Sequence, residues 1–390
     1  MADIPKIRFK GFTEPWEQRK LGEICSRVQG NDGRMELPTL TISAANGWMK
    51  QEDRFSGNIA GKEQKNYTLL HKGELSYNHG NSKLAKYGTV FSLQTYEEAL
   101  VPRVYHSFKV EIGSADFIEY YFATKMPDRE LRKLISSGAR MDGLLNIGYD
   151  DFMGIKMMFP SVLEQDKIAE YFRAFDHLIT LHQRKCDDTK ELKKYMLQKM
   201  FPKNGEKFPE IRFKGFTEAW EQRKLGKLAE IVGGGTPSTS VNSYWDGDID
   251  WYAPAEIGEQ IYLESSQRKI TEEGLNKSSA KILPIGTVLF TSRAGIGKTA
   301  ILQKEGCTNQ GFQSIVPNKE KLDSYFIFTR SEELKRYGET VGAGSTFVEV
   351  SGKQMANMEL MMPKTMPEQQ QIGEFFTNLD HLITLHRRAL

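Results

Sequence analysis

Two stretches of the chain place apolar residues at helical spacing and carry nearly the same letters. Residues 164–185 read EQDKIAEYFRAFDHLITLHQRK, and residues 368–389 read EQQQIGEFFTNLDHLITLHRRA. In both stretches the seam positions recur at intervals of four and three, which is typical of a coiled coil and predicts a partner helix. The predicted helix-packing residues are Ile168, Phe172, Phe175, Ile179 and His182 in the first stretch, and Ile372, Phe376, Leu379, Ile383 and His386 in the second.

The first of these helices is predicted to span residues 161–201. Ser161 and Glu164 form the S-x-x-E pattern of a helix start, and Pro202 and Gly205 interrupt the helical pattern at its end. About 40 residues at 1.5 Å each predict a rod of roughly 60 Å. The alternative is a core helix of one globular domain, but the same seam in both copies favours packing of the two helices on each other.

The second helix is predicted over residues 364–390, with Pro367 in its first turn. Leu390 aligns with Cys186, so the second helix lacks a counterpart of residues 187–201. Either this copy is naturally short or the chain is truncated, and the sequence leaves both open.

A second pair of repeated blocks lies at the same offset. Ile7–Gly22 reads IRFKGFTEPWEQRKLG, and Ile211–Gly226 reads IRFKGFTEAWEQRKLG, again 204 residues further on. Two blocks in one register indicate an internal duplication of a whole domain with its spacer. The predicted order is a conserved segment (1–24), a variable domain (25–160), a long helix (161–201), a linker with the repeated segment (202–228), a second variable domain (229–363) and a short helix (364–390).

The predicted fold class is mixed α/β, because short β-rich runs such as GTVLFT alternate with helical stretches such as SADFIEYYFATKM in the variable segments. We expect two globular domains separated by two long antiparallel coiled-coil helices, related by a pseudo-two-fold axis.

Composition excludes several classes of protein. The chain is 39% apolar and 27% charged, with a net charge of +2, so nucleic-acid binding would have to come from local patches. Its three cysteines stand apart from one another, which argues against a disulfide framework or a zinc knuckle. With no apolar run of about 20 residues and no secretory signal at the start, a cytoplasmic protein is expected.

Local charge patches occur inside both variable segments. Asn276–Lys304 holds five basic residues and no acidic one, and Asn78–Tyr96 holds two basic residues and no acidic one. Amide-rich strings lie beside both, and Lys, Arg, Asn and Gln are the residues that contact phosphates and base edges. A solvated surface is the alternative for each single residue. The candidate DNA-binding residues are Asn78, Lys83, Lys86, Tyr87 and Arg140 in the first domain, and Arg293, Lys298, Asn309, Gln310, Gln313, Ser345 and Thr346 in the second.

Three patterns suggest other chemistry but fit it poorly. Ser292–Thr299 resembles a phosphate-binding loop but has Ser292 where the pattern needs glycine, so a glycine-flexed basic loop is the better interpretation. Gly233–Thr236 lacks a dinucleotide-binding pattern and predicts a tight turn. His177 and His182 lie on different faces of one helix and cannot share a metal ion. No catalytic or metal-binding constellation follows. The rival functions are a stand-alone NTP-binding enzyme using Ser292–Thr299, a methyltransferase, and a coiled-coil dimerisation protein.

The order of conserved block, variable domain and long helix, repeated once, resembles the specificity subunit of type I restriction–modification enzymes. The strings WEQRKLGEI and WEQRKLGKL, GAGSTFVEVSGKQMANMELMMP and PEQQQIGEFF add to the resemblance, which extends over essentially the whole chain.

The resemblance implies that each variable segment is a target recognition domain reading one half of an asymmetric, split DNA site. It implies that the paired helices set the spacing and dock two methyltransferase subunits, which use S-adenosylmethionine to methylate adenine N6. A restriction motor-nuclease subunit using ATP and Mg would complete the endonuclease, while this chain would hold no cofactor and catalyse nothing. The short second helix is expected to weaken docking or spacing and to reduce activity.

Overall fold

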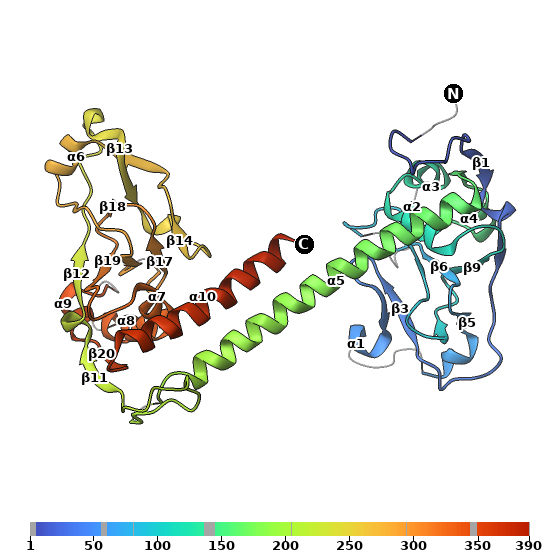
Figure 1. Cartoon of the computed structure of the whole chain (residues 1–390). Helices are drawn as coiled ribbons and strands as arrows, with labels where there is room; N and C mark the ends of the chain where they lie inside the picture. Colours follow the sequence, from blue (N-terminus) through green and yellow to red (C-terminus); the bar gives the residue numbers. More distant parts are fainter. Residues whose placement is uncertain are drawn as a thin grey trace. The chain divides into compact units, whose positions relative to one another are not determined.

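The chain is described from a computed structural model over residues 5–55, 61–80, 82–135, 145–203, 205–293, 295–343 and 349–389. It forms two compact units, unit 1 (residues 1–178) and unit 2 (residues 179–390). One long helix, α5 (Val162–Lys199), contributes residues to both (Figure 1). It ends where the proline and glycine after it predicted an end.

Unit 1 is built around a sheet with the strand order β2-β9-β6-β7, whose neighbours are all antiparallel. These strands are Cys25–Arg27 (β2), His106–Val110 (β9), Leu75–Asn78 (β6) and Thr89–Ser92 (β7). Two-stranded pairs surround it: β1 (Glu17–Lys20) with β10 (Lys156–Phe159), β3 (Leu40–Ser43) with β4 (Gly47–Lys50), and β5 (Thr68–His71) with β8 (Glu98–Val101). The helices are α1 (Gln51–Phe55), α2 (Ala115–Ala123), α3 (Asp128–Leu134) and α4 (Tyr149–Met153), with 3-10 turns at Leu21–Glu23 and Gly61–Asn66.

The core of unit 1 is aromatic. Phe108 and Phe152 are fully buried, and Tyr77 stacks on Phe152 with ring centroids 4.3 Å apart. Ser114 caps the start of α2, because its hydroxyl accepts a hydrogen bond from the Phe117 amide, and the apolar face of α2 lies against β7.

Unit 2 holds two main sheets. The larger has the order β12-β19-β16-β17-β14: Ala229–Gly233 (β12), Gln313–Pro317 (β19), Val288–Phe290 (β16), Thr299–Leu302 (β17) and Tyr262–Leu263 (β14). The smaller has the order β15-β13-β18: Arg268–Ile270, Trp245–Tyr252 and Gly306–Thr308. Strands β11 (Glu221–Lys224) and β20 (Glu359–Met362) form a separate pair. The helices are α6 (Glu272–Asn276), α7 (Ser324–Thr329), α8 (Ser331–Gly342), α9 (Gly352–Asn357) and α10 (Met366–Arg388), with 3-10 turns at Leu225–Lys227, Asn242–Tyr244 and Pro254–Glu256.

The two units share a strand order although their sequences differ. Strand β2 corresponds to β12, β9 to β19, β6 to β16 and β7 to β17, so β2-β9-β6-β7 matches β12-β19-β16-β17. The predicted mixed α/β class and the internal duplication are confirmed, and the duplication extends into the variable segments.

The repeated blocks join the two ends of each unit. Strand β1 pairs antiparallel with β10, so that the chain before the variable segment lies beside the chain after it, and β11 pairs with β20 in the same way. Arg8 binds the buried Glu164 carboxylate through two hydrogen bonds of 2.8 and 2.6 Å. Arg212 binds Glu368 equivalently, at 2.7 and 2.9 Å. We call this arrangement of block arginine and helix glutamate the clasp.

The next residue of each long helix completes the clasp. Gln165 accepts a hydrogen bond from the Ser114 amide, at the start of α2. Gln369 accepts one from the Asp323 amide, at the start of α7. The repeated residues therefore have a structural role within each unit.

The predicted capping box is only half correct. The Ser161 hydroxyl accepts a hydrogen bond from the Glu164 amide at 3.4 Å, as a helix cap should. The Glu164 carboxylate, however, binds Arg8 instead of returning to the helix start. A buried carboxylate needs a charged partner, because an unpaired charge in the interior is costly. Thr365 precedes α10 at the position that corresponds to Ser161, but its side chain makes no capping hydrogen bond.

Candidate nucleic-acid interface

The basic window of the second variable segment contains a β-hairpin loop, residues 291–298, which joins β16 to β17. The buried Thr291 organises it: the Thr291 amide donates to the Lys298 carbonyl at 3.0 Å, and the Thr291 hydroxyl accepts from the Lys298 amide at 2.9 Å. Gly295 and Gly297 have φ of +104° and +99°, a conformation that favours glycine. The loop is the glycine-flexed basic loop that the sequence predicted.

This geometry contradicts a phosphate-binding loop at Ser292–Thr299. Such a loop leads from a strand into a helix, whose first amides bind the phosphates, whereas this one leads into strand β17. Gly297 is required for packing, since a Cβ there would lie 2.3 Å from a side-chain carbon of Lys335 on α8. The NTP-binding alternative is therefore wrong for this segment.

The prediction of a tight turn at Gly233–Thr236 is also wrong. Gly233 ends β12, and Gly234 and Gly235 continue without a turn. A Cβ on Gly234 would lie 2.0 Å from the Asn309 carbonyl oxygen, so the glycines permit close backbone approach.

Two further segments adjoin the hairpin loop of unit 2. The Ser292 amide donates to the Gly311 carbonyl at 2.8 Å, and the Ser292 carbonyl accepts from the Val350 amide at 2.9 Å. Arg293 forms an isolated β-bridge with Glu349. The loop thereby meets both the turn that follows β18 and the chain that enters α9.

These contacts bring several candidate residues into one region. Arg293 and Lys298 lie on the loop, half-buried and exposed respectively. Asn309 is half-buried and its side-chain oxygen accepts from the Gly311 amide, while the exposed Gln310 accepts a hydrogen bond from Thr236. Gln313, half-buried, begins β19 opposite Gly233. The candidates Ser345 and Thr346, like Arg140 of the first domain, lie outside the described residues.

Unit 1 carries its candidates on the corresponding hairpin loop, between β6 and β7. Lys83 and Lys86 are exposed there, and the Lys86 ammonium lies 5.8 Å from the ring centre of Tyr87. The Tyr87 carbonyl accepts a hydrogen bond from the Tyr77 hydroxyl at 2.7 Å, which anchors the far side of the loop.

Asn78 has a structural use that the sequence did not predict. Its amide nitrogen donates to the Ile42 carbonyl at 3.2 Å, and its side-chain oxygen accepts from the Gly80 amide at 3.0 Å. These bonds hold the start of the loop, so Asn78 is better assigned to loop support than to base contact.

The two hairpin loops are equivalent in the fold. Each joins the third and fourth strands of the common order, and each receives a backbone hydrogen bond from the chain that enters the next helix. The Leu145 amide donates to the His79 carbonyl at 2.8 Å in unit 1, as the Val350 amide does to Ser292 in unit 2. The same place in both units therefore presents basic side chains on a loop of different sequence.

Comparison with known proteins finds similarity to type I restriction specificity subunits. A family model described as "Type I restriction modification DNA specificity domain" matches residues 217–390. The type I restriction enzyme MjaIX specificity subunit of Methanocaldococcus jannaschii is 36% identical over 167 residues, which cover 42% of this chain and 38% of that protein. The putative type I restriction enzyme MjaX specificity subunit of the same organism is 28% identical over 401 residues, 100% of this chain and 87% of that protein. Residues 217–390 therefore match the specificity-domain model, and the similarity to the MjaX subunit extends over the whole chain.

A solved structure agrees with this fold. The type I restriction-modification system S subunit from M. genitalium matches with a TM-score of 0.59 and 13% sequence identity, covering 98% of this chain and 94% of that one. This likeness concerns the fold alone. The alignment with the MjaIX subunit spans well under half of that protein's length.

Within unit 2, the C-terminal part of α5 pairs with α10. The Nδ1 atoms of His182 and His386 are 3.1 Å apart. The Cys186 sulfur lies 3.9 Å from the Ile383 carbonyl oxygen. Because the contact positions rise along α5 as they fall along α10, the two helices run antiparallel here, as predicted (Figure 1).

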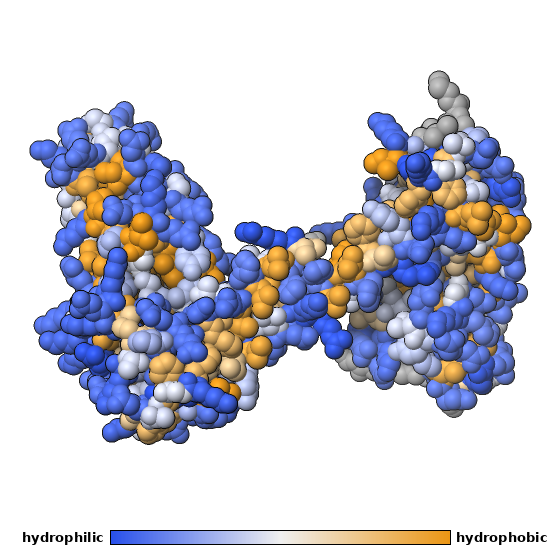
Figure 2. Space-filling view, in the orientation of Figure 1, coloured by the Kyte–Doolittle hydropathy of each residue, from blue (hydrophilic) through white to orange (hydrophobic). Residues whose placement is uncertain are grey.

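The other predicted seam residues divide between cores and surface. Ile372, Phe376 and Leu379 are buried in the core of unit 2, where they join side chains of α7 and Met200. Ile168 is partly buried and packs at the edge of the unit 1 core. Phe172, Phe175 and Ile179 are 46%, 45% and 45% exposed, on a helix whose flank shows apolar side chains in Figure 2. Their pairing stays a prediction.

One lysine of the acid-free window has an acidic partner. Lys304 lies 3.3 Å from the buried carboxylate of Asp250, which comes from β13, and Lys269 lies 3.5 Å from it. Burial raises the pKa of Asp250, but hydrogen bonds from Ser266, Ser265 and Lys304 outweigh burial and hold it below its usual value. Lys304 is therefore committed within the fold. Among the described residues, Lys83, Lys86, Arg293 and Lys298 form no ion pair.

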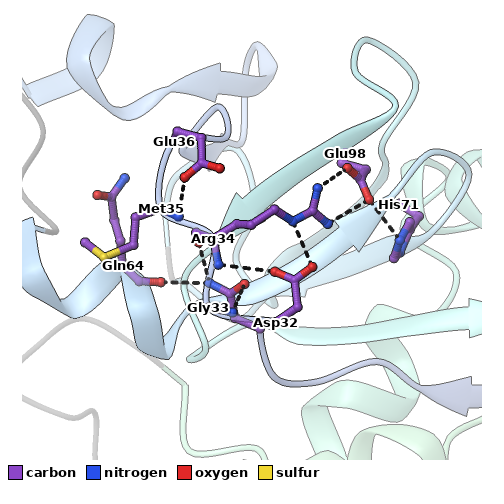
Figure 3. A network of polar contacts seen from close by, with 9 residues as sticks. Asp32, Gly33, Arg34, Met35, Glu36, Gln64, His71 and Glu98 are labelled. Carbon is purple, nitrogen blue, oxygen red and sulfur yellow. Dashed lines mark hydrogen bonds and ion pairs between the residues drawn. The ribbon is translucent and has the colours of Figure 1, made fainter.

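Arg34 of unit 1 is likewise committed, to a polar network drawn in Figure 3. Its guanidinium donates to Glu98 at 2.7 and 3.0 Å and to Asp32 at 2.8 Å. His71 lies 3.3 Å from Glu98 on the opposite side. The hydrogen bond from Arg34 lowers the pKa of Glu98, and those from the Arg34 amide and guanidinium lower that of Asp32. The network fixes the loop before β3 and leaves Arg34 few donors for a ligand.

Replacing Glu98 by glutamine should make the stability of the protein less dependent on pH in the acid range. A carboxyl whose pKa is lowered by folding stabilises above its unfolded pKa, near 4.5, and that contribution is lost as pH falls through the folded value. Parent and Glu98→Gln should therefore differ at pH 7 and converge between about pH 5 and 3. Urea unfolding across this range measures the difference, and Arg34→Met should flatten the same limb. Parallel profiles for parent and variant would contradict the assignment.

Within the described ranges, no helix is long and apolar enough to cross a membrane, and no group of three or more His, Cys, Asp or Glu side chains could hold a metal ion. Sequence reasoning missed the clasp residues and Arg268, an exposed arginine that stacks on tryptophan. The repeated letters were the available signal for the clasp, whereas no pattern in the sequence marks Arg268.

Proposed function

We propose that this specificity subunit reads a split, asymmetric DNA site, one half with each unit, and that the two equivalent hairpin loops are central to each reading surface. One observation carries the proposal: a common strand order presents uncommitted basic side chains on the same loop of both units, while the loop sequences differ. A difference in loop sequence is what reading two different half-sites requires.

The side chains suit two kinds of DNA contact. Lys83, Lys86 and Lys298 are exposed ammonium groups, which neutralise phosphates. Arg293 offers paired hydrogen-bond donors, and Gln310 offers a donor together with an acceptor. Contacts to base edges need such pairs. Gln313, Ser345 and Thr346 remain candidates of the second domain, and Tyr87 and Arg140 of the first. Their separate contributions are part of the proposal.

The partners are proposed by family resemblance. Two methyltransferase subunits would dock on the conserved helices and bind S-adenosylmethionine, and a motor-nuclease subunit would supply ATP- and Mg-dependent cleavage. This chain would bind double-stranded DNA in the cytoplasm without catalysing either reaction. The exposed apolar flank of α5, with Phe172 and Phe175, supports a protein partner there, since contiguous apolar surface marks interaction sites.

The proposed domain boundaries lead to a decisive experiment. The chain is expressed with its methyltransferase subunit in a host that lacks adenine methylation, and N6-methyladenine is mapped across the genome. We expect one split motif that depends on this chain, and replacement of residues 25–160 by another first domain should change one half of it. A motif that survives omission of the chain, or a swap that changes both halves, would reject the proposal.

Replacing Lys298 by alanine should weaken DNA binding by the assembled methyltransferase at all sequences alike. One lost phosphate contact should lower the slope of log affinity against log salt by about 0.9. Arg293→Ala should instead cost about 1–3 kcal/mol at the cognate site and relax one base position. The matched control is Lys319→Ala, an exposed lysine in the turn after β19. Equal effects of Lys298→Ala and Lys319→Ala would argue against the loop.

A further inference from the structure

The smaller sheet of unit 2 encloses a tryptophan pair. Trp245 and Trp251 both come from β13, are 8% and 5% exposed, and meet edge to face with ring centroids 5.2 Å apart. Each indole nitrogen donates to a backbone carbonyl: Trp245 to Ser238 at 3.1 Å, and Trp251 to Gly235 at 2.9 Å. With both rings buried and hydrogen-bonded, the pair is a fixed platform.

An arginine lies on this platform. The guanidinium carbon of Arg268 is 3.7 Å from the ring centre of Trp245 and 5.7 Å from that of Trp251. Arg268 is exposed, and its nitrogen atoms form no ion pair with any described residue. Stacking occupies the face of a guanidinium and leaves the N–H groups of its edge free to donate.

The charges nearby do not neutralise Arg268. Lys269, its neighbour on β15, pairs with Asp250. Successive strand residues point to opposite faces, and the register sets Lys269 beside Asp250 and Arg268 beside Trp251. The Glu256 carboxylate accepts hydrogen bonds from the Ala253 and Gln267 amides. One face of the strand therefore carries a compensated charge and the other an uncompensated one.

A short chain of contacts connects Arg268 to the proposed reading surface. The Trp251 nitrogen binds the carbonyl of Gly235, and the next residue, Thr236, donates to Gln310 at 2.5 Å. Strand β18, which leads into Gln310, is hydrogen-bonded to β13. Arg268 and the candidate Gln310 thus stand on one small subdomain.

We propose that Arg268 is a DNA-contacting residue of unit 2, pre-positioned by Trp245 and Trp251 to donate in parallel to two oxygen or nitrogen acceptors. This inference rests on the proposed function. The acceptors are either two oxygens of a phosphate or O6 and N7 of a guanine, which the same donor fork fits. Because stacking already restricts the side chain, less conformational entropy is lost when it binds.

A purely structural alternative assigns Arg268 to covering the tryptophans. Covering needs a long apolar stem and no charge, so methionine would serve equally well. The two assignments therefore predict different behaviour for Arg268→Met, which keeps the cover and removes the donors. Arg268→Lys keeps the charge and removes the parallel pair of donors.

The test uses the assembled methyltransferase with duplexes that carry its methylated motif or a scrambled one, over a series of salt concentrations. Tryptophan fluorescence during urea unfolding reports whether the platform survives. We expect Arg268→Met to unfold like the parent and to bind the cognate duplex about 5- to 150-fold more weakly. Arg268→Lys should recover part of a phosphate contact but little of a guanine contact.

The outcomes separate cleanly. A lower salt slope with equal loss on both duplexes identifies a phosphate, and loss confined to the cognate duplex with one relaxed base position identifies guanine. If Arg268→Met is folded and binds DNA like the parent, the inference is overturned. The inference is also overturned if Arg268→Met loses DNA binding because its tryptophan platform is unfolded, while Arg268→Lys binds like the parent. If Lys298→Ala weakens binding while Arg268→Met does not, only this inference fails. If the parent assembly does not bind DNA, the proposed function fails with it.

Discussion

Replacing Arg212 by methionine should lower the free energy of unfolding of unit 2 by about 3–5 kcal/mol, the usual cost of leaving one member of a buried ion pair without its partner. The Glu368 carboxylate is 2% exposed and accepts two hydrogen bonds from Arg212 and one from the Trp220 indole at 3.1 Å. Without Arg212, the indole alone would face a buried negative charge. Urea unfolding followed by fluorescence measures the change.

The double variant Arg212→Met with Glu368→Gln is the control for this result. It removes the charge as well as its partner, and a neutral amide can still accept from Trp220, so a large part of the lost stability should return. Arg8→Met tests the clasp of unit 1, where Glu164 is 1% exposed. If the double variant were no more stable than Arg212→Met, a buried uncompensated charge would not be the cause.

Phe376→Ala should destabilise unit 2 by about 3–5 kcal/mol, as expected when a fully buried phenylalanine is truncated in a core that cannot collapse around the cavity. Phe376 is 0% exposed and lies 6.2 Å from Phe201 and 5.3 Å from Phe375 between ring centroids. The parent and variant should therefore differ strongly in their urea midpoints.

The duplication supplies a matched control for this prediction. Phe172 occupies the corresponding position of α5, contacts Tyr120, and is 46% exposed. Because the loss scales with the area withdrawn from water and with the cavity left, Phe172→Ala should cost well under half as much. Equal losses would show that exposure at this position does not distinguish the two copies.

The architecture could be predicted from the sequence because the internal duplication is preserved as two pairs of nearly identical sequence blocks. Two blocks at one offset predicted the internal duplication, and seam spacing with flanking Pro and Gly predicted each end of α5 to within two residues. The clasp was not readable, since Arg8 and Glu164 are 156 residues apart and the letters S-x-x-E fit a capping box equally well. Only tertiary structure shows which partner a glutamate takes.

The candidate interface was predicted less completely, for the same reason. A sequence window without acidic residues can still have acidic partners in the folded structure, because Asp250, which lies outside the window, pairs with Lys304. Asn78 has the chemistry of a base reader, but its side chain holds a turn. Arg268 lies between Gln267 and Lys269 in the sequence, and only the register of β15 places it beside Trp251 while Lys269 lies beside Asp250. The residue type suggests that a side chain could contact DNA, but the strand or turn on which it lies determines whether the side chain is free to do so.

The strand pairs β1–β10 and β11–β20 affect how readily the segment between their strands can be replaced. Since β1 and β10 are neighbours, the two ends of the intervening segment are fixed about 4.8 Å apart, one strand spacing. A replacement segment needs only to close a loop on those same ends, and closure entropy changes slowly with loop length. Because Arg8 and Arg212 face equivalent glutamates, a genetic crossover within the repeated letters would transfer a complete domain together with the contacts that seal it.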